Sequence, residues 1–130
     1  IAHEMFQEFV GLSAADFSSE LYMSVEEVRE LVRNGMYVGS HGSMHYWLDQ
    51  ITPEEQEQDI KQSLKFLDSV GASTKDWVMC YPYGAHNDDT IELLKSFEAA
   101  LGITTEVRVA NLTSDNPFKF PRLDTNDFPQ

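Results

Sequence analysis

Apolar residues recur at helical spacing in four stretches of the chain, which predicts four helices. Recognisable boundary signals accompany them: Gly11 after Ile1–Val10, the capping boxes Ser24–Glu27 and Thr52–Glu55, and the N-cap residue Asn87. The second helix should end at Gly35, and the third should run to about Ser69. Polar residues dominate the remaining positions of each stretch, so each helix is expected to bury one face only.

Short apolar runs between these helices are suited to buried strands. They are Met36–Val38, Trp77–Tyr81 and Gly102–Thr105, and Leu123–Thr125 lies near a possible last strand. Leu12–Met23 is expected to be a loop with short turns. Helix and strand in alternation predict an α/β fold with at least three helices and a mostly parallel sheet, open or closed into a barrel. Without repeats or a Pro/Gly/Ser linker, residues 1–130 are expected to form a single domain.

The composition narrows the range of partners. A formal net charge of −13 argues against nucleic acid and against anionic membrane surfaces, since both require clusters of Lys and Arg. Neutral or cationic ligands, amino sugars included, remain compatible, although solubility is the plainer explanation of the charge. The single cysteine, Cys80, rules out an internal disulfide and a thiolate zinc cluster. Ile1–Val10 has no basic region typical of a secretion signal, and no apolar run could cross a membrane, so the compartment stays open, with the cytoplasm favoured.

The stretch Ser40–His45 (SHGSMH) places two histidines four residues apart, directly after a predicted strand. Neutral imidazole is the commonest protein ligand for zinc and similar metals, and Gly42 and Ser43 permit a tight turn that aims both rings at one point. His41 and His45 are therefore candidate metal ligands. Taken alone, the spacing also fits a polar loop whose imidazoles bond to the backbone.

Three further features combine polar or aromatic groups with strand ends. Tyr81–Gly84 (YPYG) is either part of a binding site or a plain turn with its aromatic rings in the core. Tyr46 and Trp47 can stack on sugar faces or pack inside the protein. Arg122 can hold a nearby carboxylate in its ionised form, or it can make a surface ion pair.

The stretch from Leu21 to Leu67, together with two later blocks, resembles the polysaccharide deacetylases of carbohydrate esterase family four, which are related to nodulation chitooligosaccharide deacetylase. The matching text is Asn34–His41 (NGMYVGSH), Gly42–Leu48 (GSMHYWL), Ile51–Glu55 (ITPEE), Tyr81–Gly84 and Phe120–Asp124 (FPRLD). Gly42 departs from the family, where a hydroxyl residue usually follows the first histidine, and Ser43 offers a hydroxyl instead. The resemblance covers the central portion of the family's domain and implies part of a distorted (β/α) barrel.

This resemblance implies a metal-dependent hydrolase that removes an N-acyl group, typically acetyl, from a polysaccharide or amino sugar. It assigns a divalent metal, zinc, to His41 and His45, oxyanion stabilisation to the Tyr83 backbone N–H, a substrate-binding wall to Tyr81 and Pro82, and orientation of a catalytic Asp to Arg122. A fixed N–H and a metal both stabilise the oxyanion that develops in amide hydrolysis. Trp47 is the candidate for stacking on the sugar.

Two motifs of the family have no counterpart here. The Thr-Phe-Asp-Asp motif supplies the general base and a third metal ligand, and the most similar segment of this chain is Asp16-Phe17. The late Leu-x-Leu/Ile-His motif supplies the general acid, and hydrolysis needs both groups. The intact motif blocks favour a piece of a full deacetylase. The alternative is a non-catalytic α/β module that binds metal, carbohydrate or a partner, and it gains weight if the two histidines lie far apart.

Overall fold

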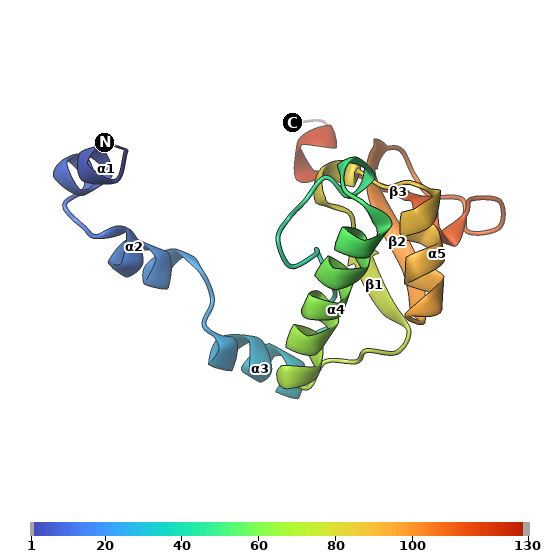
Figure 1. Ribbon diagram of the computed structural model, residues 1–130, viewed down its shortest axis with the longest axis horizontal. Helices are drawn as coiled ribbons and strands as arrows, with labels where there is room; N and C mark the ends of the chain where they lie inside the picture. The colour runs from blue at the N-terminus through green and yellow to red at the C-terminus, as the bar shows by residue number, and fades with distance from the viewer. Residues whose placement is uncertain (1, 129–130) are drawn as a thin grey trace. The chain divides into compact units, whose positions relative to one another are not determined.

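A computed structural model describes residues 2–128 of the chain, with side chains from residue 4 onward. The chain divides into two compact units, one up to residue 36 and one from residue 37 on, and each is described by itself. Figure 1 labels the helices and strands of both. No helix among the described residues is long and apolar enough to cross a membrane.

The first unit consists of three short helices, α1 (Ala2–Val10), α2 (Ala14–Leu21) and α3 (Val25–Arg33). The predicted capping box at the start of α3 is formed, because the Ser24 hydroxyl accepts from the Glu27 N–H and the Glu27 carboxylate accepts from the Ser24 N–H. The predicted loop over residues 12–23 is wrong, since α2 lies there. Ser13 caps α2 by accepting a hydrogen bond from the Asp16 N–H at 3.1 Å.

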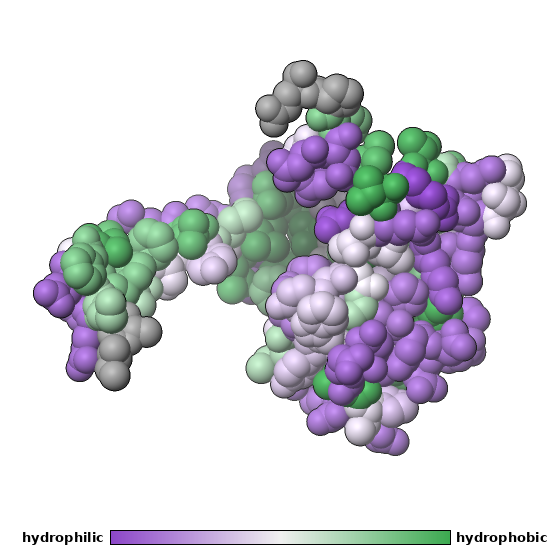
Figure 2. Space-filling view, turned by 90° about the horizontal axis from the view of Figure 1, so that it is seen from above, coloured by the Kyte–Doolittle hydropathy of each residue, from purple (hydrophilic) through white to green (hydrophobic). Residues whose placement is uncertain are grey.

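The first unit has little core of its own. No described side chain between residues 4 and 36 is fully buried. One edge-to-face contact joins α1 to α2, between the rings of Phe6 and Phe17 with centroids 5.2 Å apart. Figure 2 shows apolar side chains gathered along this unit, and the most exposed are Phe9, Tyr22, Leu21 and Met36.

The second unit is an α/β layer structure. Its main elements are α4 (Pro53–Ser69), β1 (Trp77–Cys80), α5 (Asp88–Ser96), β2 (Ala99–Val107) and β3 (Phe120–Arg122), with 3-10 turns at Leu48–Gln50, Pro82–Gly84, Pro117–Lys119 and Thr125–Asp127. The strands form one sheet in the order β1-β2-β3, and both pairings are parallel. The predicted α/β class with a parallel sheet is therefore confirmed, and so are the capping box of Thr52 with Glu55 and the N-cap at Asn87.

The core of this unit lies between the sheet and the pair of helices α4 and α5, which run side by side in Figure 1. Its central buried cluster comprises Leu48, Ile60, Trp77, Met79, Tyr81 and Leu94. The indole N–H of Trp77 donates to the Phe97 carbonyl at 2.7 Å, so the largest core side chain leaves no polar group unsatisfied. The apolar stripes predicted for the two helices are confirmed by the burial of Ile60, Leu67, Ile91 and Leu94.

The segment before the histidines is not the buried strand predicted over Met36–Val38. Met36 and Tyr37 are exposed, and only Ser40 pairs with the sheet, through an isolated parallel bridge to Met79. The Ser40 N–H donates to Val78 and the Ser40 carbonyl accepts from Cys80, both at 2.9 Å. Because one residue alone makes ladder hydrogen bonds, the segment stays extended without becoming a strand.

The carboxyl ends of the paired segments meet at one edge of the sheet. His41 follows the bridge residue Ser40, Tyr81 follows β1, and Arg122 ends β3. Sites in parallel α/β folds lie at this edge. The fold therefore brings the three predicted motifs to the same end of the second unit.

Replacing Leu94 with Ala should destabilise the second unit by roughly 2–5 kcal/mol, because the side chain is fully buried and its removal leaves a cavity. The matched control is Leu112→Ala, whose side chain is 79% exposed, and it should change stability by less than about 0.5 kcal/mol. Urea unfolding followed by tryptophan fluorescence measures both. Equal effects of the two variants would show that the core is misplaced.

Candidate metal centre and active site

The two predicted metal ligands lie against each other. The Nε2 atoms of His41 and His45 are 3.0 Å apart. The Nδ1 atom of His41 is 2.7 Å from the Cys80 carbonyl oxygen, which can only accept, so Nδ1 carries the proton and donates it. The Nε2 atom of His41 therefore presents a lone pair toward His45, as a metal ligand requires.

This donor pair fits a divalent metal. Zinc–imidazole bonds of about 2.0–2.1 Å place two ligand nitrogens roughly 2.8–3.4 Å apart at ordinary coordination angles, and the observed 3.0 Å lies in that range. Without metal, the same distance is a hydrogen bond in which His45 Nε2–H donates to His41. Among residues 4–128, no group of three or more His, Cys, Asp or Glu side chains could hold a metal together. The described chain thus offers two ligands for a metal.

The backbone between the histidines is tightly constrained. Gly42 has φ +73° and His45 has φ +57°, in the left-handed region that non-glycine residues adopt uncommonly. A Cβ atom at position 42 would lie 2.7 Å from the Asp59 carboxylate oxygen Oδ2, so a side chain has no room there. The departure from the family noted at Gly42 therefore has a steric reason in this chain.

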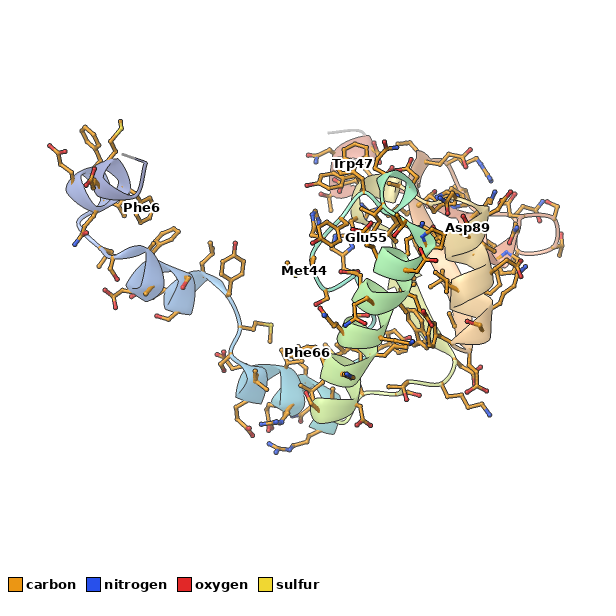
Figure 3. All side chains as sticks on the ribbon, viewed as in Figure 1. Phe6, Met44, Trp47, Glu55, Phe66 and Asp89 are labelled. Atoms are coloured by element: carbon orange, nitrogen blue, oxygen red, sulfur yellow. The ribbon has the colours of Figure 1, made fainter. Side chains whose placement is uncertain are left out.

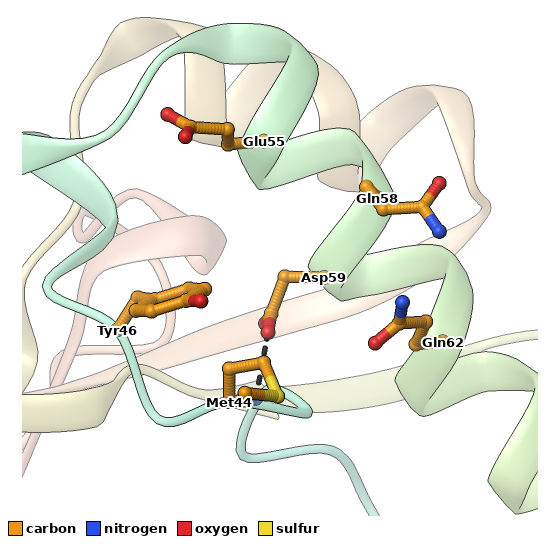
Figure 4. Close-up of a pocket in the computed structure, with 6 residues that line it drawn as sticks. All are labelled: Met44, Tyr46, Glu55, Gln58, Asp59 and Gln62. Carbon is orange, nitrogen blue, oxygen red and sulfur yellow. Dashed lines mark hydrogen bonds between the residues drawn. The ribbon is translucent and has the colours of Figure 1, made fainter.

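Asp59 is a site residue whose role was not predicted. It projects from α4 and is buried, and its two oxygens accept from the backbone N–H groups of Ser43 at 3.0 Å and Met44 at 2.7 Å. Figure 4 shows the carboxylate pointing from the helix to the loop. An acidic residue one position before the buried Ile60, within an apolar helix face, was the sequence signal that could have revealed it.

Two aromatic rings continue the site beyond the histidines. The Tyr83 ring lies edge-on to His45 with centroids 4.7 Å apart, and its other neighbour, Trp47, stacks on it at 4.4 Å with an interplanar angle of 12°. Both aromatic residues are about half exposed, at 51% and 52%. In Figure 3, Trp47 lies near the N-terminal end of α4, where Glu55 is labelled. The structure thus brings Trp47 and Tyr83 to the histidine pair, with ring surface open to solvent.

The backbone of Tyr83 is held in an unusual conformation, with φ +58°. The neighbouring N–H groups of Tyr81, Gly84 and Ala85 donate to the carbonyls of Ile103, Tyr81 and Pro82. The Tyr83 N–H is not among these donors in the described chain. An oxyanion donor likewise needs an N–H without a partner inside the protein.

Tyr81 and Pro82 lie in the core, not on an exposed wall. Tyr81 is 2% exposed, and its hydroxyl donates to the Phe118 carbonyl at 2.8 Å. Burial raises the pKa of this phenol well above its usual value. Its ring stacks on His86, with centroids 4.7 Å apart. Of the two interpretations of the YPYG block, the core interpretation holds for these side chains, and Tyr83 alone presents its ring to the surface.

Arg122 lines one cleft together with His41 and Cys80, and no ion pair of its side chain occurs among the described residues. The nearby Asp124 has a pKa below its usual value. The main cause is a hydrogen bond from the Asn126 N–H, and the charge of Arg122 contributes less. Arg122 thus borders the same cleft as His41 and makes no ion pair in this part of the chain.

Comparison with known proteins identifies the family of this chain. The sequence profile of the polysaccharide deacetylases matches residues 10–102, which is more than half of the chain. The chain belongs to the polysaccharide deacetylase family. The resemblance inferred from the histidine and YPYG blocks is therefore confirmed.

Individual relatives agree with this assignment. A putative polysaccharide deacetylase of Bacillus subtilis (strain 168), YxkH, is 26% identical over 90 residues, which is 69% of this chain and 32% of that protein. The Streptococcus pyogenes deacetylase PplD, solved in complex with acetate, is 25% identical, with a TM-score of 0.72 over 83% of this chain and 47% of that one. IcaB from Ammonifex degensii is 29% identical, with a TM-score of 0.63 over 80% of this chain and 48% of that one. The match to this polysaccharide deacetylase chain thus spans from 32% to 48% of the length of these relatives.

The two tyrosines of the YPYG block should respond differently to loss of their hydroxyls. Tyr81→Phe should cost roughly 0.5–1.5 kcal/mol of stability, because the Phe118 carbonyl loses its donor inside the core. Tyr83→Phe should leave stability within about 0.5 kcal/mol of the wild type, since that side chain is half exposed. Thermal unfolding of the two variants compares them, and a larger loss for Tyr83→Phe would contradict the placement of both side chains.

Proposed function

We propose that this protein is a metal-dependent deacetylase acting on an N-acetylated polysaccharide or amino sugar. The observation that carries the proposal is the pair of imidazole Nε2 atoms 3.0 Å apart, in a chain that belongs to the polysaccharide deacetylase family. The solved relative from Streptococcus pyogenes is a deacetylase in complex with acetate, which supports acetyl as the group removed.

His41 and His45 would hold the metal, and zinc is the ion that this pair of imidazoles suits best. A divalent metal supplies Lewis acidity toward a carbonyl and toward water. The Cys80 carbonyl keeps the first imidazole in one tautomer and one orientation. The chain's own contribution is thus a preorganised pair of neutral ligands at the end of a parallel sheet.

The reaction consumes one water molecule per acetyl group. The oxygen of water bonds to the acyl carbon, the bond from that carbon to the sugar nitrogen breaks, and the products are acetate and an amine that has taken up a proton. The negative charge that develops on the acyl oxygen needs a fixed donor, and the Tyr83 N–H is the group in this chain that is available for it. Arg122, which faces the same cleft as His41, would orient the carboxylate that acts as general base.

A sugar would bind on the stacked aromatic pair. Trp47 and Tyr83 adjoin His45 and keep about half of their surface exposed. Aromatic faces suit the apolar faces of sugar rings, and an uncharged N-acetylated sugar meets no repulsion from a chain of net charge −13. We further propose that the parallel sheet is part of a distorted (β/α) barrel. Because the matched residues 10–102 include parts of both units, both would belong to one deacetylase domain.

Metal binding tests the ligand assignment. The wild-type chain should bind zinc, and replacement of both His41 and His45 by Ala should abolish that binding, because no third ligand among the described residues can substitute. His86→Ala is the matched control, since that imidazole stacks on Tyr81 and forms no three-ligand group with the pair among the described residues, and it should keep the wild-type affinity. Isothermal titration measures all three proteins. Equal zinc binding by the double variant and the wild type would refute the metal centre.

Acetate release tests the activity. A longer protein that contains this chain should release acetate from N-acetylglucosamine oligomers, and a chelator should abolish the release. Residues 1–130 alone should be slower by about 10²–10⁴-fold for each missing acid or base. Chelator-insensitive release would overturn the metal-dependent mechanism. Binding of metal and sugar without any release would favour the non-catalytic alternative.

A further inference from the structure

We infer that Asp59 is a positioning residue of the metal centre, whose carboxylate fixes the backbone between His41 and His45. The inference rests on the proposed metal site. Its starting point is a pair of hydrogen bonds: Oδ1 accepts from the Met44 N–H at 2.7 Å, and Oδ2 accepts from the Ser43 N–H at 3.0 Å. These are the last two backbone amides before His45, so the carboxylate holds the chain at the point where it turns the second ligand toward the first.

No other polar partner of Asp59 occurs among the described residues that would account for an aspartate at this position. It lies inside α4, where Asp is a poor helix former, and it is 2% exposed next to the core residue Ile60. No ion pair among the described residues includes it. A buried carboxylate is costly unless hydrogen bonds satisfy it, and here the loop amides do so. The interactions that stabilise this aspartate are therefore its hydrogen bonds to the loop.

The loop is shaped to receive this carboxylate. Three successive N–H groups point inward: that of Gly42 donates to the Ser40 hydroxyl at 3.2 Å, and those of Ser43 and Met44 donate to Asp59. Successive amides of this kind form a concave site for an anion. Because Gly42 has no Cβ, Oδ2 can approach the backbone closely. The Asp59 carboxylate thus occupies the anion site that the turn forms.

The consequence falls on His45. Its backbone is left-handed, with φ +57°, a conformation that non-glycine residues adopt uncommonly and that surrounding contacts usually hold in place. The two hydrogen bonds to Asp59 immediately precede this residue and supply the constraint. Without them the turn can relax and His45 Nε2 can move away from His41 Nε2. Loss of groups that orient metal ligands typically lowers metal affinity by about 10–100-fold.

The test compares two variants of buried polar residues on α4. Asp59→Asn is isosteric but offers one acceptor oxygen, and its NH₂ group faces one of the two amides, so zinc or cobalt affinity should fall by about 10–100-fold. Gln56→Ala is the matched control. Gln56 is equally buried one turn earlier, but its amide oxygen accepts from Thr90, away from the histidines. That variant should lose stability yet keep its metal affinity. Competition with a chromophoric chelator, at a temperature where both variants are folded, measures the affinities.

Affinity of Asp59→Asn within twofold of the wild type, or an equal loss of affinity in Gln56→Ala, would overturn the inference. The absorption spectrum of bound cobalt adds a readout of ligand geometry, and it should change in Asp59→Asn but not in the control. If the wild-type protein binds no metal through His41 and His45, the proposed function fails. That result is distinct from failure of the positioning role of Asp59.

Amide exchange tests the two hydrogen bonds from the loop to Asp59 without metal and without a variant. The Ser43 and Met44 amides belong to exposed residues, yet they should exchange slowly because each donates to a buried carboxylate. Exchange at the rate of an open loop would overturn the inference even if Asp59→Asn does not fold. Slow exchange at these two amides supports it.

Discussion

The geometry of the site depends on the two hydrogen bonds that attach Ser40 to β1. They fix which residue of the incoming segment lies opposite Met79, and so they bring His41 to the Cys80 carbonyl. A slip of one residue would turn the imidazole to the other face of the sheet, because side chains alternate along an extended chain. The tautomer of His41 and the direction of its Nε2 lone pair follow from this bridge, and the hydrogen bonds from Ser43 and Met44 to Asp59 then hold the loop that leads to His45.

How far the sequence alone could predict this structure depends on the range of the interactions involved. The capping boxes at Ser24 and Thr52 are formed within four residues, so local pattern was sufficient to place α3 and α4. The run Met36–Val38 misled because an apolar triplet does not determine whether a partner strand lies in register beside it. The missed helix α2 is preceded by its N-cap residue Ser13, which bonds to Asp16, and this local signal was not accompanied by a clear apolar stripe.

The candidate site shows the same division. The histidine pair was predictable because its two members share one short loop. The core position of Tyr81 also had a signal: burial alternates along β1, with Trp77 and Met79 inside, and Tyr81 continues that alternation. The role of Asp59 had only an indirect one, since a carboxylate on a helix acquires its partners through the fold. Long-range contacts of this kind carry no pattern in a single sequence.

The buried face of α4 is not purely apolar, and this links the core to the site. Asp59 and Ser63 lie there beside Ile60 and Leu67. Both of these polar side chains bond to the segment that carries the histidines: Asp59 accepts from the loop amides, and Ser63 accepts from the Ser40 hydroxyl at 2.8 Å. A buried polar pair allows only one register between helix and loop, whereas apolar packing tolerates small shifts. The same helix therefore packs against the core and fixes the position of the loop. A change that shifts α4 along the sheet should displace His41 and His45 through these side chains before the protein unfolds.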